Sequence, residues 1–223
     1  MRKIYLDQAS TSYPKAPSVA QAVYDYLNGS GVNVNRGGYQ AAYSVEEQIF
    51  ETREQLLHLF HFTSGKGKNV IFTPNITTSL NILLKGLLKP GDHVLVSAME
   101  HNAVMRPLVQ LSQNGITFDR IPCRSDGSLL IEKAEGLLRP ETRLLVCLHA
   151  SNVCGTMMPL QEIGKFCQKH GLLFILDTAQ TAGVIPIDME ALHIDALAFT
   201  GHKALRGPQG TGGFLLHNEL VSC

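Results

Sequence analysis

The sequence predicts a three-layer α/β protein, in which a mostly parallel sheet is covered on both faces by helices. Two observations lead to this prediction. From residue 69 onward, short apolar segments of strand length alternate with longer segments whose apolar residues recur at helical spacing. The length of 223 residues also suits one sizeable α/β domain rather than two complete ones.

The first part of the chain differs from the rest. Two helical segments, 18–27 and 44–60, flank a loop at 33–38. We therefore expect one domain over 1–223 that begins with an N-terminal helical segment, over about residues 1–65. The expected strands are 69–73, 93–97, 116–122, 144–149, 172–177, 196–200 and 213–216, and the expected helices beyond residue 65 are 77–88, 103–113, 131–138 and 160–170.

The charge balance argues against a nucleic-acid or anionic-membrane partner. The chain has 19 basic and 19 acidic residues, whereas such surfaces need an excess of lysine and arginine. No apolar run approaches the roughly 20 residues that span a bilayer. No apolar signal segment precedes Ile4, and we therefore expect a cytoplasmic protein.

The cysteines and histidines do not predict a metal site. The five cysteines are scattered, odd in number and without a CxxC pair, so we expect reduced thiols, mostly in the core, rather than disulfides or structural zinc. The nine histidines form no HExxH motif.

Polar residues follow two of the expected strands. Asp177 ends the strand 172–177, and Lys203 comes shortly after the strand 196–200. Ligands of parallel α/β sheets bind beyond the carboxyl ends of the strands, which makes both residues candidates for a site. Two structural alternatives remain open: Asp177 as a helix N-cap, and Lys203 as an ordinary surface lysine.

A third strand leads into a cluster of hydroxyl-bearing residues at 73–79, where a helix is expected to begin. Hydroxyls and free N–H groups at a helix N-terminus suit a phosphate, although simple capping by Thr77 is the structural alternative. Together the three strand ends supply a phosphate cradle, an anion at Asp177 and an amine at Lys203. Pyridoxal phosphate (PLP) needs all three.

Several segments resemble the class V aminotransferases and cysteine desulfurases. The resemblance runs in order from residue 4 to about 216. It implies the large domain of the aspartate-aminotransferase-like fold (fold type I) and PLP as the cofactor. The matching segments are 5–11 (YLDQAST), 99–102 (MEHN), 149–156 (HASNVCGT), 177–180 (DTAQ), 198–203 (AFTGHK) and 207–212 (GPQGTG).

The resemblance also implies a role for each site residue. Lys203 would form the Schiff base with PLP and shuttle the Cα proton, Asp177 would keep the pyridine nitrogen protonated, and His101 would stack on the ring. Gln180 would bond the ring hydroxyl oxygen, and Asn152 would lie near that oxygen and the substrate carboxylate. The residues implied to hold the phosphate are Ile76 (through its backbone), Thr77, Thr200 and His202.

The chain departs from the family in three places. Relatives continue into a smaller C-terminal domain with the substrate-binding arginine and the nucleophilic cysteine, so we expect this sequence to be the large-domain portion only. Neither Cys154 nor Cys223 lies where that cysteine is expected. The phosphate loop carries Pro74-Asn75-Ile76 where relatives use smaller residues. Asn35 and Arg36 lie in a substrate-binding loop, where Tyr39 replaces a common histidine.

Three functions remain open at this point. The first is a cysteine desulfurase-like enzyme, which converts L-cysteine to L-alanine and enzyme-bound sulfur, as a homodimer with a sulfur-accepting protein. The second is another class V PLP enzyme, such as an aminotransferase, lyase or epimerase. The third is a non-catalytic fragment that binds PLP without turnover.

Overall fold

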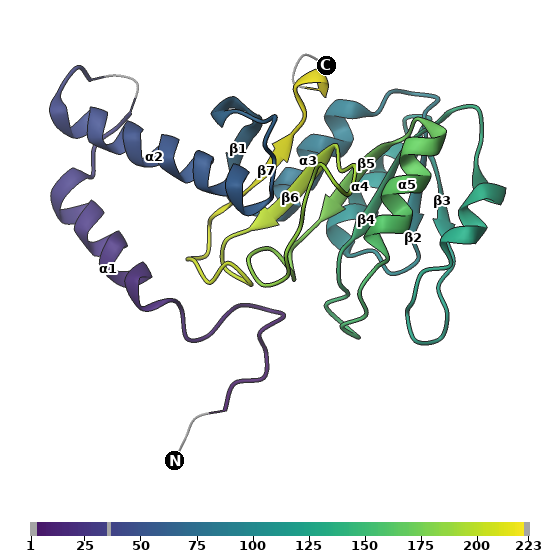
Figure 1. Cartoon of the computed structure of the whole chain (residues 1–223), viewed down its shortest axis with the longest axis horizontal. Helices are drawn as coiled ribbons and strands as arrows, with labels where there is room; N and C mark the ends of the chain where they lie inside the picture. The colour runs from purple at the N-terminus through teal and green to yellow at the C-terminus, as the bar shows by residue number, and fades with distance from the viewer. Residues whose placement is uncertain (1–3, 35–36, 221–223) are drawn as a thin grey trace.

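A seven-stranded sheet forms the centre of the molecule. The computed structural model describes residues 4–34 and 37–220 (Figure 1). The strand order is β1-β7-β6-β5-β4-β2-β3. The strands are β1 (Val70–Thr73), β2 (His93–Ser97), β3 (Thr117–Ile121), β4 (Thr142–Leu148), β5 (Leu173–Asp177), β6 (Ala196–Thr200) and β7 (Gly212–Leu216).

Within the described chain, β7 alone runs against the other strands. It pairs antiparallel with both β1 and β6, while the remaining pairs are parallel. The carboxyl ends of the other six strands therefore meet at one edge of the sheet. This arrangement confirms the predicted mostly parallel sheet and brings Thr73, Asp177 and Thr200 to the same edge.

Helices cover both faces of the sheet, which confirms the three layers. Helices α3 (Ile76–Leu87) and α4 (Asn102–Ser112) lie behind the sheet in Figure 1, and α5 (Leu160–His170) lies in front of it. Successive residues of β4 alternate between two core clusters. Leu144 packs in the cluster that contains α3 and α4, and Leu145 packs in the cluster that contains α5.

The predicted helix at 131–138 is a 3₁₀ helix, Ile131–Leu137, rather than an α-helix. Ala134 is its one buried residue, and no side chain caps its N-terminus. A segment with so little apolar surface to bury gains little from the longer α-helical hydrogen-bond ladder.

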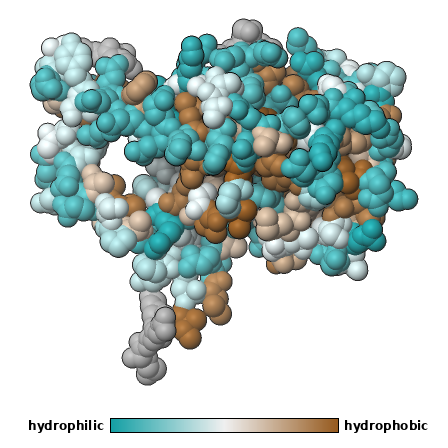
Figure 2. All heavy atoms as spheres, viewed as in Figure 1, coloured by the Kyte–Doolittle hydropathy of each residue, from teal (hydrophilic) through white to brown (hydrophobic). Residues whose placement is uncertain are grey.

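The N-terminal segment extends away from the sheet (Figure 1). It comprises α1 (Pro17–Asp25), a π-helical turn (Tyr26–Ser30) and α2 (Gln40–Leu59). None of the side chains of α1 is buried, whereas α2 reaches the core through Leu56 and Leu57. In Figure 2 hydrophobic residues are visible near the N-terminal end of the chain, before α1. Hydrophilic residues cover much of the visible face of the rest of the molecule.

None of the helices formed by the described residues combines the length and the apolarity needed to cross a bilayer. Likewise, no three histidine, cysteine, aspartate or glutamate side chains in the described part of the chain lie close enough together to hold a metal ion.

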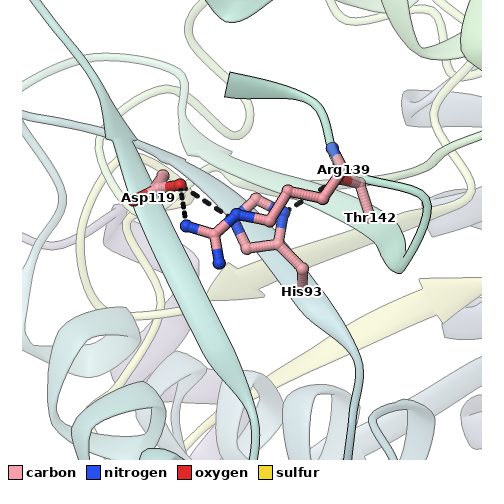
Figure 3. Close-up of polar contacts among 4 residues, drawn as sticks. All are labelled: His93, Asp119, Arg139 and Thr142. Atoms are coloured by element: carbon pink, nitrogen blue, oxygen red, sulfur yellow. Dashed lines mark hydrogen bonds and ion pairs between the residues drawn. The ribbon is translucent and has the colours of Figure 1, made fainter. Parts of the chain in front are cut away.

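A buried histidine ties three strands together at the opposite, amino-terminal edge of the sheet (Figure 3). His93 Nδ1 lies 2.8 Å from Thr142 Oγ1, and His93 Nε2 lies 3.3 Å from Asp119 Oδ2. Thr142 Oγ1 accepts the Arg139 backbone N–H, so its hydroxyl is free to donate to Nδ1. Burial first, and then the Arg139 guanidinium, lower the pKa of His93. These contacts favour a neutral ring with its proton on Nε2, facing Asp119.

Replacing His93 with alanine is expected to destabilise the protein by about 2–4 kcal/mol, because it opens a buried cavity and leaves Thr142 and Asp119 with fewer partners. Urea unfolding at neutral pH measures this change. The exposed His58 gives a matched control, since H58A should shift stability by less than about 0.5 kcal/mol. Equal effects of H93A and H58A would contradict the structural role of His93.

Candidate active site

A pocket of about 110 Å³ opens at the carboxyl edge of the sheet. It lies beyond the carboxyl ends of β1, β4, β5 and β6, where the sequence pattern predicted a ligand site. All nine residues predicted to bind the cofactor line this one pocket: Ile76, Thr77, His101, Asn152, Asp177, Gln180, Thr200, His202 and Lys203. The two predicted substrate residues Asn35 and Arg36 lie outside the described residues.

Asp177 is a buried carboxyl at the end of β5, with 4% of its surface exposed. Its Oδ1 accepts the N–H of Ala179 at 2.8 Å. A turn follows in the described chain, and no α-helix begins there, so the N-cap alternative is wrong. Burial raises the pKa of Asp177, whereas the Ala179 N–H and the positive charges of His101 and Lys203 lower it.

Lys203 is half-buried and lines the pocket. The surface-lysine alternative is therefore wrong. Burial lowers the pKa of Lys203, and the nearby Asp177 carboxylate works in the opposite direction. A lowered pKa increases the share of the neutral amine, which is the nucleophilic form of lysine.

The N-terminus of α3 carries free N–H groups toward the pocket. Asn75 is the N-cap, and its side chain accepts the N–H of Thr78 at 2.9 Å. The alternative of capping by Thr77 is therefore wrong. Because the first N–H groups of a helix have no acceptor within it, those of Ile76 and Thr77 have no partner among the described residues. Both residues line the pocket and can receive an anion.

His101 is the N-cap of α4 and also lines the pocket. Its Nδ1 accepts the N–H of Ala103 at 3.0 Å. In the neutral ring the proton therefore lies on Nε2. This hydrogen bond fixes the tautomer and holds the base of the imidazole at the start of α4.

The segment before α1 binds the backbone next to Lys203. The carbonyl of His202 accepts the N–H of Ser12 at 3.0 Å and the Nζ of Lys15 at 2.8 Å. His202 Nδ1 also lies 3.1 Å from Thr11 Oγ1. Burial, Lys203 and Lys15 lower the pKa of His202. The sequence analysis missed Lys15, and no local pattern marks it, because its partner is 187 residues away.

A second, larger pocket of about 460 Å³ adjoins the first. The two share Gln180 and Lys203, and the same N-terminal segment lines the second one. Gln180 Nε2 donates to the carbonyl of Ala9 at 3.1 Å, which ties that segment to the wall between the pockets. Arg206 also lines the second pocket and brings a positive charge near Lys203.

Gly212 allows β7 to approach the N-terminus of α3 closely. A Cβ at this position would lie 2.9 Å from both Asn75 Cα and the carbonyl oxygen of Phe199. Both are backbone atoms, which yield little. The glycine therefore permits close contact between the strand and the N-cap of α3.

Replacing Gly212 with alanine is expected to lower stability by about 1–3 kcal/mol, because the added methyl overpacks rigid backbone. Thermal unfolding measures the change. Gly86 in α3 has open space around it, so G86A should leave stability unchanged or raise it by up to about 1 kcal/mol. A neutral G212A would contradict the tight approach.

The described cysteines are free thiols. Cys147 and Cys167 are buried, whereas Cys154 is exposed in the loop beyond β4. Cys154 Sγ lies 3.3 Å from Thr156 Oγ1, and hydrogen bonds with Ser151 and Thr156 lower its pKa to about 7. Cys223 lies outside the described residues.

The sequence matches the family model "Aminotransferase class-V" over residues 4–222. The chain belongs to the class V aminotransferase family. Among its curated relatives it is 31% identical over 222 residues to a cysteine desulfurase IscS of a Shewanella species, covering 97% of this chain and 54% of the relative. It is 33% identical over 214 residues to a probable cysteine desulfurase of Halalkalibacterium halodurans, covering 94% and 52%.

Solved structures agree with this membership of the class V family. The fold matches the apo cysteine desulfurase of Thermococcus onnurineus with a TM-score of 0.91 and 29% identity, over 98% of this chain and 55% of that one. It matches a structure titled "SspA in complex with cysteine" with a TM-score of 0.88 and 25% identity, over 97% and 62%. The chain spans about half the length of the curated relatives it matches.

Proposed function

We propose that this protein is a PLP-dependent enzyme that acts on an amino acid, with Lys203 as the residue that binds the cofactor covalently. One observation carries the proposal: an amine with a lowered pKa, a buried carboxyl and a helix N-terminus with free N–H groups line a single pocket. PLP has an aldehyde, a pyridine nitrogen and a phosphate, and each finds a matching group there.

The residues present fit this cofactor. The N–H groups of Ile76 and Thr77, with the side chains of Thr77, Thr200 and His202, would hold the phosphate. The tight packing at Gly212 keeps the α3 N-terminus in place for this contact. Asp177 would bond the pyridine nitrogen, because it is a buried acceptor at the end of β5. Gln180 and Asn152 would hold the ring hydroxyl oxygen.

Each side chain also has a part in the reaction. The bound cofactor supplies an electron sink that stabilises negative charge at the substrate Cα. The Lys203 amine is placed to accept and return the Cα proton. His101 is a second group for proton transfer, since its Nε2 faces away from the helix cap. Asp177 keeps the cofactor nitrogen protonated through its negative charge. The adjoining pocket gives an amino acid access to Lys203.

L-cysteine is the substrate we propose, with L-alanine and enzyme-bound sulfur as the products. Identities of 31% and 33% to proteins named as cysteine desulfurases support this choice, as does the cysteine in the SspA structure. The proposal includes a homodimer, a sulfur-accepting partner protein and a cytoplasmic location. Asn35 and Arg36 are proposed to contact the substrate together with Asn152.

The test is product analysis with PLP-loaded protein and L-cysteine. Equal amounts of alanine and sulfide, the latter in the presence of a thiol reductant, would support desulfuration. Amino transfer to a keto acid without sulfide release would support another class V reaction instead. Cofactor binding without turnover of any amino acid would contradict the enzymatic proposal for this chain.

A further inference from the structure

Glu100 lies beside the pocket, at the turn between β2 and His101. Part of the residue is exposed, but its Oε2 is buried and has no hydrogen-bond partner among the described residues. Glu100 does not line the pocket, and the sequence resemblance assigns it no role. A buried carboxyl oxygen without a partner, this close to a candidate active site, calls for an explanation.

The other oxygen joins two strands. Glu100 Oε1 accepts the backbone N–H of Leu148 at 2.9 Å, and it lies 2.5 Å from Ser97 Oγ. Ser97 is the last residue of β2, and Leu148 is the last residue of β4. The carboxyl therefore holds the carboxyl ends of two neighbouring strands together, directly before His101.

The groups around Glu100 do not favour a negative charge. The titratable groups within electrostatic range are the acidic side chains Asp177 on β5, Cys147 on β4 and Cys123 beyond β3. Among the described residues, an ionised carboxylate here would have one oxygen without a donor, and no cation is among the charges that act on it, which is costly in a buried position.

Asp177 differs from Glu100 in the charges that surround it. Its carboxyl accepts the Ala179 N–H and feels the positive charges of His101 and Lys203. Two buried carboxyls that repel each other share the available proton unequally, and the proton goes to the one whose charge no nearby cation stabilises. Burial, reinforced by Asp177, raises the pKa of Glu100 to about 8 despite the bonds from Ser97 and Leu148.

We propose that Glu100 is a neutral positioning residue, whose protonated carboxyl joins the ends of β2 and β4, holds His101 at the pocket and leaves Asp177 as the ionised carboxylate. The benefit to a bound cofactor rests on the proposed function. The charge state of Glu100 does not, and it can be measured in the protein without cofactor.

The first test is the pH dependence of unfolding. Because the folded pKa of Glu100 is raised from 4.5 to about 8, folding takes up one proton between these values. The stability from the protonated form is complete below the unfolded pKa and is lost as the pH rises through about 8. Between about pH 5 and pH 8, the ratio of the unfolding constant of wild type to that of E100Q should therefore rise about tenfold for each pH unit.

The exposed Glu132 provides the matched control, and E132Q should keep the wild-type slope. Equal slopes for wild type and E100Q would overturn the proposal. So would failure of E100Q to fold, because glutamine reproduces the neutral side chain.

Infrared spectroscopy of the cofactor-free protein at neutral pH gives the second test. The carbonyl band of a protonated carboxylic acid should be present in wild type and D177N and absent in E100Q. A band that persists in E100Q and disappears in D177N would place the proton on Asp177 and overturn the proposal. Neither result depends on whether the protein binds PLP or turns over cysteine.

Discussion

Replacing Lys203 with alanine is expected to abolish covalent attachment of the cofactor and to lower turnover of the amino acid by about 10²–10⁴-fold. The pocket would lose the amine that we propose binds the cofactor aldehyde and moves the Cα proton. The groups proposed to hold the phosphate at the N-terminus of α3 would remain, so K203A should still bind PLP without covalent attachment. Visible absorbance of the linkage, together with dialysis, separates the two forms of binding.

The exposed Lys165 is the control for this experiment. Lys165 lies on α5, which covers the face of the sheet opposite the one that α3 and α4 cover. K165A should keep both the absorbance and the turnover of wild type. Equal absorbance in wild type and K203A would count against the proposed linkage.

Asparagine in place of Asp177 is expected to leave the cofactor attached but to lower turnover by about 10²–10³-fold, the size of effect found when one preorganised electrostatic contact is removed. Asparagine keeps the size of the side chain and can still accept the Ala179 N–H. It cannot supply the negative charge that keeps a pyridine nitrogen protonated.

Absorbance and turnover of D177N, measured on the same sample, check this prediction. The matched variant is D188N, because Asp188 is another aspartate whose Oδ1 accepts a backbone N–H, that of Ala191. D188N should retain wild-type turnover. Full turnover in D177N would show that the buried charge is not needed.

The sequence predicted the fold closely because its signals are local. The strands 93–97 and 196–200 and the helix 160–170 agree with the structure residue for residue. Apolar strand segments and helical spacing are properties of neighbouring residues. The segment 131–138 was less predictable, because its choice of a 3₁₀ helix depends on how little of it packs against the sheet.

The candidate site was predictable only in part. The strand order brings the carboxyl ends of β1, β5 and β6 together. The alternation of strands and helices along the chain predicts a parallel sheet with a ligand site at that edge. Asn75 carried a readable signal, since asparagine before a helix is a common N-cap. Lys15 and Glu100 did not, because their respective partners His202 and Leu148 come from distant segments and the burial of a single oxygen is a property of the folded chain.

The measurement that tests the central claim most directly is the mass of the Lys203 peptide after the PLP-loaded protein is reduced with borohydride and digested. The proposal predicts that the peptide carrying Lys203 gains the mass of the reduced cofactor in wild type and that no peptide gains it in K203A. Modification of a different lysine, or of none, would contradict the proposal that Lys203 binds the cofactor.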